Sequence, residues 1–421
     1  MQTKRKVVVV GGGFAGIALA RSLDTHQFTA TLIDQNNYHL FQPLLYQVAT
    51  GSMSATDIAA PLRMIIKPAT ARVVQEQVIG VDRQFKRVLT ASGHVYPWDI
   101  LVLATGLGHS YFGHDEWAEF APSLKYLEDA FSIRDRILQA LEAAETCQRD
   151  DERKPLLHFA VVGGGPTGVE IAGAIGELTG RTLAREFHSF DPRSATIDLL
   201  EAGPRILPTY TKSAATEAES RLKKLGVTVL TQTKVLAVDG RGVLMADAAK
   251  SERRIAAANI IWAAGASATP LSQTICQQLG ITTERGGRVK VDEHFTVPGQ
   301  SDVFVVGDLA HYELNDKPLP GLAPAAEQAG RYVGDYLNGR PGSFHYRDRG
   351  TLAVIGRNAA VGTVLGRSVT GPIAWWLWLF VHIRELVGFD VKLKVTVEWA
   401  WKFLFDKYGA RIAARRRPKS S

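Results

Sequence analysis

The chain has only two cysteines among its 421 residues. Cys147 and Cys276 stand far apart and in no CxxC or metal-ligand spacing, which argues against a disulfide framework and indicates a reducing compartment. The eleven histidines form no HExxH or similar cluster, so no structural metal is expected. A cleavable apolar core is also missing near the amino terminus, where residues 4–6 are basic, and no signal peptide is expected.

Length and composition allow a globular protein of two or three domains. Apolar residues make up 46% of the chain and charged residues 22%, which is ordinary for a globular protein. Part of the net charge of +7 is concentrated near the carboxyl end, in Arg411, Arg415, Arg416, Arg417 and Lys419. Such an end can bind nucleic acid or anionic lipid, but composition alone favours a solvated tail, and no nucleic-acid partner is expected.

The first strong motif is a glycine-rich turn between a strand and a helix. A four-valine run ending at Val10 predicts a buried parallel strand, and a GxGxxG pattern leads from it into the helix. The three glycines permit the tight turn, the approach of a pyrophosphate to bare backbone, and close helix–strand packing. The next predicted strand, Ala30–Asp34, ends in an acid where a ribose-binding carboxylate belongs. The candidate cofactor-binding residues of this first site are Gly11, Gly13, Phe14, Ala15, Gly16 and Asp34.

The same arrangement returns in the middle of the chain. A second buried strand pattern over residues 156–162 precedes another GxGxxG, and the strand pattern 195–201 again ends in an acid. This acid lies further from its glycines, and we expect Thr179–Pro192 to take up the extra length as an elongated helix and a loop. The candidate cofactor-binding residues of this second site are Gly163, Gly165, Gly168 and Glu201. Two such units form an internal repeat on the scale of a domain.

Three further strand patterns complete the two units. Leu101–Gly106 returns to the first sheet, Ile260–Gly265 mirrors it in the second, and Ser301–Ala310 follows later in the chain. Because the second unit falls between these parts of the first, we expect it to be inserted there. The predicted fold class is α/β, with two Rossmann-like dinucleotide-binding domains, the second inserted in the first, plus a C-terminal amphipathic membrane-docking region.

The acids indicate which ribose each site accepts. A carboxylate at the end of the second strand hydrogen-bonds ribose hydroxyls and repels a 2′-phosphate. Asp34 and Glu201 are both acids, so neither site is built for a phosphorylated ribose. Arg205 follows four residues after Glu201 and leaves some tolerance of NADPH open. We interpret the second site as selective for NADH.

The order of these motifs resembles the two-dinucleotide-binding-domain flavoprotein family over about residues 4–330. The resemblance implies FAD in the first site, where Asp308 binds the ribityl chain, and NADH in the second. It adds to the candidate cofactor-binding residues Thr105, Gly106, Gly265, Gly307 and Asp308. The expected domains are residues 1–150 and 271–340 for FAD, 151–270 for NADH, and 341–421 for membrane docking or dimerisation.

The residues after the first site distinguish branches of that family by electron acceptor. Dithiol branches carry a paired-cysteine motif there, and sulfide:quinone oxidoreductases need reactive cysteines near the flavin, but this region has no cysteine. Tyr38–Gly51 instead resembles the signature of type II, non-proton-pumping NADH:quinone oxidoreductases. The resemblance implies that Thr50 and Gly51 approach the flavin ring. The quinone-pocket residues that it implies are Phe41, Gln42, Pro43, Leu44, Tyr46 and Gln47. Without the flanking fingerprints, the same apolar segment would be interpreted as a loop that packs in the core.

A second segment, Gly321–Gly330, resembles the Ala-Gln-x-Ala-x-Gln motif of the same branch. The resemblance implies that Ala326 lies beside the flavin and that Gln328 is a candidate catalytic polar group. Pro324 departs from the pattern, since the family often has a glutamine there that reaches toward the quinone. Proline is well tolerated in the first turn of a helix.

Glu170 is the other candidate catalytic residue. It follows Gly168 by two residues on the first turn of the second nucleotide helix, where a carboxylate also suits the helix dipole. One interpretation is therefore helix capping. The resemblance implies another, a position near the nicotinamide and the flavin from which Glu170 orients NADH or relays protons. We favour the second interpretation and expect a shifted pKa for this carboxyl group.

The carboxyl end is apolar and rich in tryptophan. Residues 372–383 are strongly apolar but too few to span a bilayer, which takes about 20 residues. Val391–Ile412 then predicts an amphipathic helix with tryptophans and a basic end, which is typical of a helix that lies in the lipid interface. Its apolar stripe comprises Leu393, Val397, Trp401, Leu404, Tyr408 and Ile412, widened by Val395, Trp399 and Phe403. Dimerisation or covering of the core is the alternative role.

Together these features predict FAD-dependent oxidation of NADH with two-electron reduction of a membrane quinone, without proton pumping. The expected partners are the quinone and the lipid bilayer surface, with a homodimer as a further option. The expected location is the cytoplasmic face of the cell membrane, as a peripheral respiratory-chain enzyme. One alternative is a soluble NADH:acceptor flavoreductase that passes electrons to a ferredoxin-like protein or to oxygen. Another is a flavin- and NADH-binding regulatory protein with slow turnover.

Overall fold

The computed structural model describes residues 3–314, 317–340, 342–386, 389–405 and 411–412. The chain divides into two compact units. The first unit comprises Met1–Leu40, Ala59–Gly108 and Ala266–Arg349, and the second comprises Phe41–Ile58, His109–Gly265 and Gly350–Ser421. Each unit has a parallel sheet of its own, so the second nucleotide unit is inserted in the first, as the sequence predicts.

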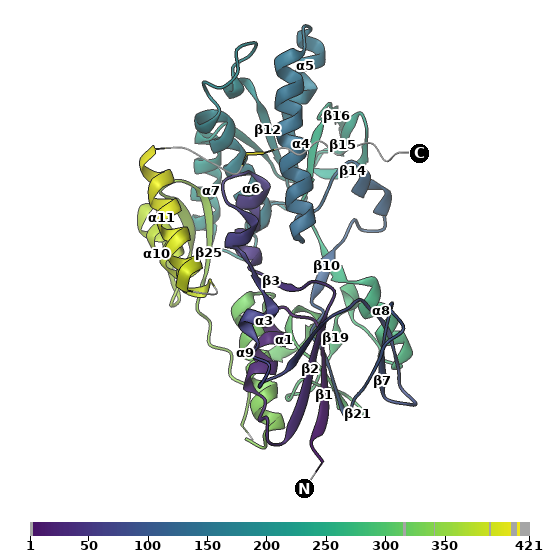
Figure 1. The fold of residues 1–421 in the computed structure, drawn as a ribbon. Helices are drawn as coiled ribbons and strands as arrows, with labels where there is room; N and C mark the ends of the chain where they lie inside the picture. Colours follow the sequence, from purple (N-terminus) through teal and green to yellow (C-terminus); the bar gives the residue numbers. More distant parts are fainter. Residues whose placement is uncertain (1–2, 315–316, 341, 387–388, 406–410, 413–421) are drawn as a thin grey trace. The chain divides into compact units, whose positions relative to one another are not determined.

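The first unit is built on a six-stranded sheet in the order β20-β21-β9-β1-β2-β5 (Figure 1). Its strands are β1 (Arg5–Val10), β2 (Phe28–Asp34), β5 (Arg72–Gln75), β9 (Ile100–Leu103), β20 (Thr296–Val297) and β21 (Gln300–Val305). All neighbours pair in parallel except the edge strand β20. The valines of β1 are at most 3% exposed and the strand pairs in parallel on both sides, which confirms the prediction of a buried parallel strand.

Small residues bring two helices of the first unit together. In α1 (Phe14–Ser22) and α9 (Ala323–Leu337), a β-carbon on Gly330 would collide with the carbonyl of Ala15, and one on Gly334 would collide with Ser22. Glycine therefore sets the distance between the two helix backbones. Pro324 lies in the first turn of α9, where its missing N–H costs no hydrogen bond.

Shorter elements complete the first unit. β3 (Tyr38–Leu40) pairs with β4 (Ala59–Pro61), and an antiparallel sheet contains β6 (Val78–Asp82), β7 (Arg87–Thr90) and β8 (Val95–Pro97). The helices are α3 (Leu62–Ile65) and α8 (Pro270–Gln278). Further short strands of the chain are β10 (Leu107–His109), β18 (Ala266–Ala268), β19 (Val289–Lys290), β22 (Ala310–His311), β23 (Glu313–Leu314) and β24 (Lys317–Pro318).

The second unit repeats the plan with a four-stranded parallel sheet in the order β13-β12-β11-β17. Its strands are β11 (His158–Val162), β12 (Thr196–Leu200), β13 (Val227–Leu230) and β17 (Asn259–Trp262). Its helices include α2 (Leu45–Ala49), α4 (Leu127–Thr146), α6 (Pro166–Glu177) and α7 (Lys212–Lys224). An antiparallel sheet follows with β14 (Lys234–Asp239), β15 (Gly242–Ala246) and β16 (Glu252–Ile255). After α6 a π-helical turn, Leu178–Thr182, continues the helix, in line with the elongated helix and loop expected there.

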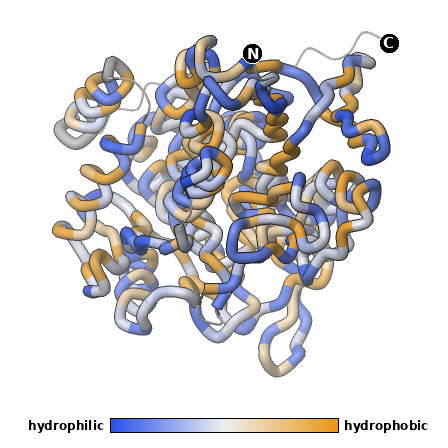
Figure 2. The backbone as a smooth tube through the Cα atoms, turned by 90° about the horizontal axis from the view of Figure 1, so that it is seen from below, coloured by the Kyte–Doolittle hydropathy of each residue, from blue (hydrophilic) through white to orange (hydrophobic). Residues whose placement is uncertain are grey.

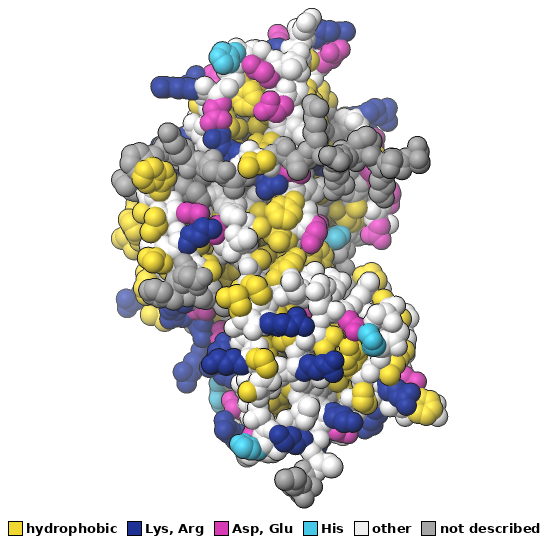
Figure 3. All heavy atoms as spheres, viewed as in Figure 1, with side chains coloured by type: hydrophobic (Ala, Val, Ile, Leu, Met, Phe, Trp, Pro, Cys, Tyr) yellow, Lys and Arg dark blue, Asp and Glu magenta, His cyan; other side chains and the backbone are white. Residues whose placement is uncertain are grey.

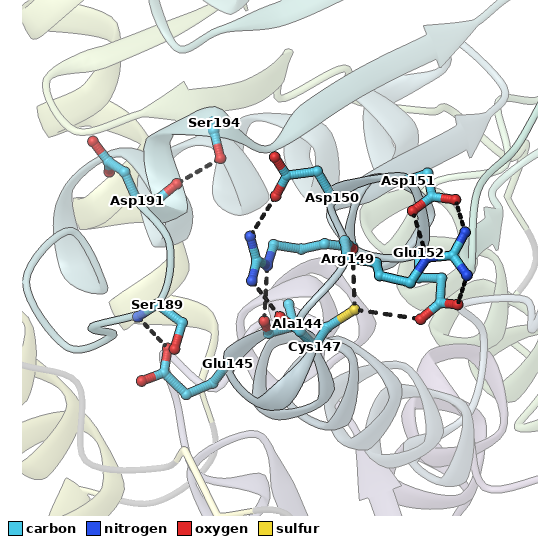
Figure 4. A network of polar contacts seen from close by, with 11 residues as sticks. Ala144, Glu145, Cys147, Arg149, Asp150, Asp151, Glu152, Ser189, Asp191 and Ser194 are labelled. Carbon is cyan, nitrogen blue, oxygen red and sulfur yellow. Dashed lines mark hydrogen bonds and ion pairs between the residues drawn. The ribbon is translucent and has the colours of Figure 1, made fainter.

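A polar network joins α4 to the short helix α5 (Asp150–Leu156), as Figure 4 shows. Arg149 contacts Asp151 at 2.6 Å and Glu152 at 3.4 Å, and the thiol of Cys147 donates to the Arg149 carbonyl at 3.3 Å. Most of these side chains are exposed, so the ion pairs contribute little stability. They shape the turn between α4 and α5.

The carboxyl end of the second unit consists of a small sheet and two helices. These are β25 (Thr351–Gly356), β26 (Ala359–Val364), β27 (Arg367–Thr370), α10 (Gly371–Glu385) and α11 (Phe389–Phe405). Figure 2 shows hydrophobic and hydrophilic residues interspersed along the backbone of the chain. No helix within the described ranges is long and apolar enough to cross a membrane.

Helix α11 differs in one respect from the predicted apolar stripe. Leu393, Val397 and Trp401 are each more than half exposed, but Val395 and Trp399, which were expected to widen the same stripe, are buried. The helix therefore has an outer and an inner apolar face. Tyr408 and the basic residues 415–419 lie outside the described residues, and so do the side chains of Phe403 and Leu404.

Candidate nucleotide sites and candidate pocket

The first glycine turn leaves the amino end of α1 open to a ligand. Gly11 has a φ of 111°, and a β-carbon there would collide with the Ala104 carbonyl, so only glycine fits. Gly16 packs equally tightly against the Gly11 carbonyl, whereas Gly13 faces open space. The first turn of α1 has no side-chain cap and no acidic residue. Its backbone N–H groups are thus available to an anion, and this geometry fits the pyrophosphate of a dinucleotide.

Asp34, at the end of β2, is held against this turn by two backbone amides. One carboxylate oxygen accepts from the N–H of Gly12 at 2.6 Å and the other from the N–H of Asn36 at 2.7 Å. Burial raises the pKa of Asp34, and the two amides oppose that shift. Each carboxylate oxygen has a further lone pair for a ribose hydroxyl.

His39 also braces the first turn, and the sequence analysis missed it. Its ring is 6% exposed, its Nδ1 lies 3.2 Å from the Gly12 carbonyl, and it contacts the Phe14 ring edge-on at 4.7 Å. Burial lowers the pKa of His39, which favours a neutral ring that donates from Nδ1. A buried histidine in an apolar segment gives no distinctive sequence signal.

The remaining candidates of the first unit lie at several positions, and three of them form a cluster. Gly307, Ala15 and Ala326 lie together, since a β-carbon on Gly307 would be 3.3 Å from that of Ala15 and 3.8 Å from that of Ala326. Thr105 bonds Ser272 through their hydroxyls at 2.7 Å, Gly106 has a φ of 65°, and Asp308 lies near Gly321. Gln328 is engaged elsewhere, because its amide donates to the carbonyl and accepts from the N–H of Arg347.

The second glycine turn reproduces the geometry of the first. Gly163 also has a φ of 111°, with a β-carbon position 2.8 Å from the Ala263 carbonyl, and Gly165 faces open space at the start of α6. Gly168 packs against the Gly163 carbonyl. The carbonyl of Gly164, which corresponds to Gly12, accepts from the backbone N–H of Leu207 at 2.7 Å. This second turn also fits a dinucleotide.

Glu201 occupies the place that Asp34 has in the first site. Its carboxylate accepts from the N–H of Gly164 at 2.7 Å and from the N–H of Gly203 at 2.5 Å. Arg205 donates instead to the carbonyls of Tyr210 and Pro208, at 2.9 and 2.7 Å. In the sequence, Arg205 left open whether the site also accepts NADPH. Its guanidinium donates to backbone carbonyls in the structure, which supports selectivity for an unphosphorylated ribose.

Gly265 lies beyond the end of β17, beneath an aromatic side chain. The tip of the Phe112 ring is 2.7 Å from the position of a β-carbon on Gly265. Phe112 is 67% exposed and has a φ of 56°, which is unusual for a bulky residue. A phenylalanine in a loop is not distinctive in sequence, so the sequence analysis did not identify it.

A pocket lies within the second unit, enclosing about 820 Å³ that includes open solvent. It is formed by α2 and the residues after it, one face of α6, strand β25, and the inner faces of α10 and α11. Its lining residues are Tyr46, Gln47, Thr50, Ser52, Glu170, Ala174, Glu177, Leu178, Val354, Gly356, Arg357, Trp375, Trp378 and Trp399. Apolar walls with a few polar groups are typical of a small-molecule site.

Glu170 is a pocket residue with a strongly perturbed acidity. Desolvation raises its pKa to about 8, and a long hydrogen bond of 3.4 Å from the N–H of Val354 only partly offsets the shift. The carboxyl group therefore carries a proton at neutral pH. Tyr210 is also affected, since burial and the nearby Glu170 raise its pKa. The expectation of a shifted pKa for Glu170 agrees with this environment.

The predicted quinone-pocket residues separate in the structure. Tyr46 and Gln47 line the pocket, as does Thr50, whereas Phe41, Gln42, Pro43 and Leu44 do not. Leu44 is completely buried, the Phe41 ring lies 5.9 Å from that of His382, and Gln42 bonds Lys125. Gly51, with a φ of 67°, follows Thr50 in the same unit. Among the residues the structure describes, no cluster of three His, Cys, Asp or Glu side chains could bind a metal.

Two parallel sheets, each with a glycine turn and an acid at the next strand end, define a protein that binds two dinucleotides. A model of the pyridine nucleotide-disulphide oxidoreductase family matches residues 5–330, and one of the NDH2 C-terminal domain matches residues 349–407. A type II NADH:quinone oxidoreductase of Mycobacterium tuberculosis is 38% identical over 96% of this chain and 89% of its own length. A second enzyme so named from the same organism is 40% identical over 95% and 87%. The chain belongs to the pyridine nucleotide-disulphide oxidoreductase family and, within it, to the type II NADH:quinone oxidoreductases.

Solved structures agree on the fold. The structure of NDH2 from Plasmodium falciparum in complex with NADH has a TM-score of 0.88 and 21% identity, covering 98% of this chain and 100% of that one. A sulfide:quinone oxidoreductase from Aquifex aeolicus has a TM-score of 0.70 and 18% identity, covering 95% and 91%. At these identities the likeness shows a shared fold, and it confirms the predicted α/β class.

Proposed function

We propose that the chain catalyses the FAD-dependent oxidation of NADH and the two-electron reduction of a membrane quinone, without pumping protons. In this reaction NADH, a proton and the quinone yield NAD⁺ and the quinol. The observation that carries the proposal is the presence of two complete dinucleotide sites in a member of the type II family. The pocket of the second unit supplies the third component, a place for the quinone.

The two nucleotide sites divide the cofactors between them. The amino end of α1, Asp34 and Asp308 bind FAD, with Gly11, Gly13 and Gly16 shaping the turn. The amino end of α6 and Glu201 bind NADH. When bound, FAD accepts a hydride from NADH and passes two electrons onward. The chain's own residues hold the cofactors, and the arrangement needs no nucleophilic side chain.

Within the pocket, Glu170 holds the proton that a reduced quinone requires. Its raised pKa of about 8 keeps it protonated at neutral pH, so it can act as a general acid toward a quinone oxygen. Tyr46 and Gln47 place further polar groups on the wall, and Trp375 and Trp378 supply apolar surface for the head group. Gln328, which is bonded to Arg347, contributes through the first unit by ordering the residues after α9.

The outer faces of α10 and α11 support peripheral docking on lipid. Six large apolar residues are more than half exposed there: Ile373, Trp376, Phe380, Leu393, Val397 and Trp401. Figure 3 shows hydrophobic side chains gathered at the edge where these helices lie. Tryptophans on an exposed apolar helix face favour the lipid interface. We infer docking on the cytoplasmic face of the membrane, where the quinone is dissolved, with a second copy of the chain as the alternative occupant.

The test is NADH oxidation by the FAD-loaded protein, with and without a short-chain quinone and lipid vesicles. Quinone-dependent turnover that vesicles enhance would support both the reaction and the docking. Rapid bleaching of the flavin by NADH without reoxidation by any quinone would retain the two nucleotide sites and refute the proposed acceptor.

A further inference from the structure

Helix α11 lines the pocket directly through Trp399 and also holds one segment of the second unit that forms part of the wall. This segment, residues 41–58, contains α2 and supplies Tyr46, Gln47, Thr50 and Ser52 to the pocket wall. Within it, the Thr50 hydroxyl donates to the Tyr46 carbonyl at 2.9 Å and the Ser52 hydroxyl donates to the Gln47 carbonyl at 2.9 Å. These are local contacts. Gln42, at the start of the segment, bonds Lys125, and two further ties come from α11.

The first tie is an ion pair. Lys394 lies 2.6 Å from a carboxylate oxygen of Asp57, whose side chain is only 1% exposed. The other oxygen of Asp57 accepts from the N–H of Ser54 at 3.1 Å in a capping box. A buried carboxylate needs a partner, because an unpaired charge in that position is costly. Lys394 is that partner, from a residue 337 positions further along the chain.

The second tie reaches the pocket wall directly. The indole N–H of Trp399 donates to the side-chain carbonyl of Gln47 at 3.2 Å, and the amide of Gln47 donates to the Tyr46 hydroxyl at 3.1 Å. The Trp399 ring stacks on Trp378 at 5.3 Å, and Trp378 stacks on His382 at 4.3 Å. The stack gives Trp399 a defined orientation, and the hydrogen bond transmits that orientation to Gln47.

The same helix presents its other face outward. Leu393, Val397 and Trp401 are 56–58% exposed, whereas Val395 and Trp399 are at most 9% exposed. Lys394 and Trp399 therefore stand on the helix that we assign to the lipid surface. A displacement of α11 moves the anchors of the pocket segment.

From these contacts we propose that Lys394 and Trp399 are positioning residues for quinone, which hold the segment 41–58 in its pocket-forming conformation from the docking helix α11. The proposal rests on the proposed quinone reduction. Neither residue supplies a proton or an electron. Their loss loosens the wall that carries Tyr46 and Gln47, so quinone binding suffers while the two nucleotide turns keep their geometry.

Trp399→Phe is the sharpest variant, because it keeps an aromatic ring beside Trp378 and removes the N–H that reaches Gln47. We expect the quinone KM to rise about fivefold, the effect of one lost hydrogen bond, with the NADH-driven reduction of ferricyanide unchanged. Trp262→Phe is the matched control, since it removes an indole N–H bond of 2.9 Å to the Ser110 carbonyl elsewhere in the same unit. Its quinone KM should equal that of the wild type.

Lys394→Met tests the ion pair and Lys394→Arg tests rescue. The methionine leaves Asp57 buried without its cation, so we expect a larger rise in quinone KM than in Trp399→Phe, whereas arginine keeps the charge and restores a near-normal value. Lys392→Met, which removes a lysine of the same helix that bonds the Arg384 carbonyl, is the charge control. A merely structural role would lower quinone and ferricyanide turnover together.

Hydrogen exchange separates this proposal from the proposed function. Trp399→Phe and Lys394→Met should accelerate amide exchange in residues 41–58 relative to the wild type, whether or not any quinone is reduced. Unchanged exchange and an unchanged quinone KM in both variants would overturn the positioning role. A wild type that reduces ferricyanide but no quinone would refute the acceptor, and exchange in residues 41–58 would then decide the positioning role alone.

Discussion

At the scale of the residue, the two glycine turns differ in what holds the carbonyl of their middle glycine. In the second turn a backbone amide, that of Leu207, donates to Gly164. In the first turn the donor is the side chain of His39, which reaches Gly12. A backbone donor survives any substitution except proline, whereas a side-chain donor depends on one residue. The first site is therefore the more sensitive of the two to mutation.

His39→Phe should weaken FAD binding and spare NADH binding. Phenylalanine keeps the edge contact with Phe14 but cannot donate to Gly12, so we expect the FAD dissociation constant to rise about fivefold, the effect of one hydrogen bond. Flavin content after gel filtration and fluorescence titration of the apoprotein measure it. His94→Phe, at an exposed site of the same unit, is the control. An equal loss of NADH affinity would contradict this assignment.

Glu170→Gln should remove a pH dependence. Because burial raises the pKa of Glu170 from its ordinary value of 4.5 to about 8, the wild-type donor loses its proton, and quinone reduction falls, as the pH rises through about 8. The glutamine variant should be slower and lack that fall. The steady-state rate with saturating quinone between pH 6 and 9 is the measurement, and a variant that keeps the wild-type profile would exclude Glu170 as the donor.

Glu170→Gln should slow quinone reduction, but it should stabilise the folded protein above pH 4.5. Below pH 4.5 the carboxyl group is protonated in both folded and unfolded chains and contributes nothing to the difference. Between pH 4.5 and about 8 the unfolded chain releases the proton that the folded chain keeps, so the wild type loses stability as the pH rises. Glu170→Gln should therefore raise the melting temperature at pH 8 and leave it nearly unchanged at pH 4.

At the scale of the element, the contact between α1 and α9 is set by glycine. Gly330→Ala places a methyl group against the Ala15 carbonyl and should lower the free energy of unfolding by about 1–3 kcal/mol through overpacking. Ala15 of α1 and Ala326 of α9 lie beside Gly307, a candidate FAD-binding residue. A shift of the two helices should therefore lower the flavin content too. Thermal unfolding and flavin absorbance measure both effects. Gly342→Ala, where a β-carbon meets no neighbour, is the control and should behave as the wild type.

At the scale of the whole molecule, attachment to lipid should depend on the outer faces of α10 and α11. Ile373 and Phe380 are 71% and 66% exposed, and changing both to aspartate adds charge where we expect contact with acyl chains. The double variant should remain in the supernatant when anionic vesicles are sedimented, with ferricyanide reduction unchanged. Phe85→Asp, at a 59% exposed site of the first unit, should sediment like the wild type. Sedimentation of both variants with the vesicles would favour a dimer interface.

Much of the molecule could be predicted because its signals are local. The glycine turns, the valine strand and the acids at the strand ends lie within short stretches, and each motif needs only its own backbone geometry. Glu170 was identifiable for the same reason, since it follows the second turn by two residues. The buried faces of the C-terminal helices were harder to predict, because an apolar stripe does not reveal which of its residues other elements cover. Val395 and Trp399 looked like part of the outer stripe and are buried.

The sequence by itself determined the two dinucleotide sites, the inserted order of the units and the branch of the family, because these follow from residue types at fixed short spacings. Only the tertiary structure decided which residues meet from distant positions. In the folded protein His39 contacts the Gly12 carbonyl, Arg205 donates to backbone carbonyls, and Lys394 pairs with Asp57 although most of the chain separates them. The physical reason is that burial and hydrogen-bond partners are properties of the packed state. A spacing pattern carries no information on which side chain a buried carboxylate will find.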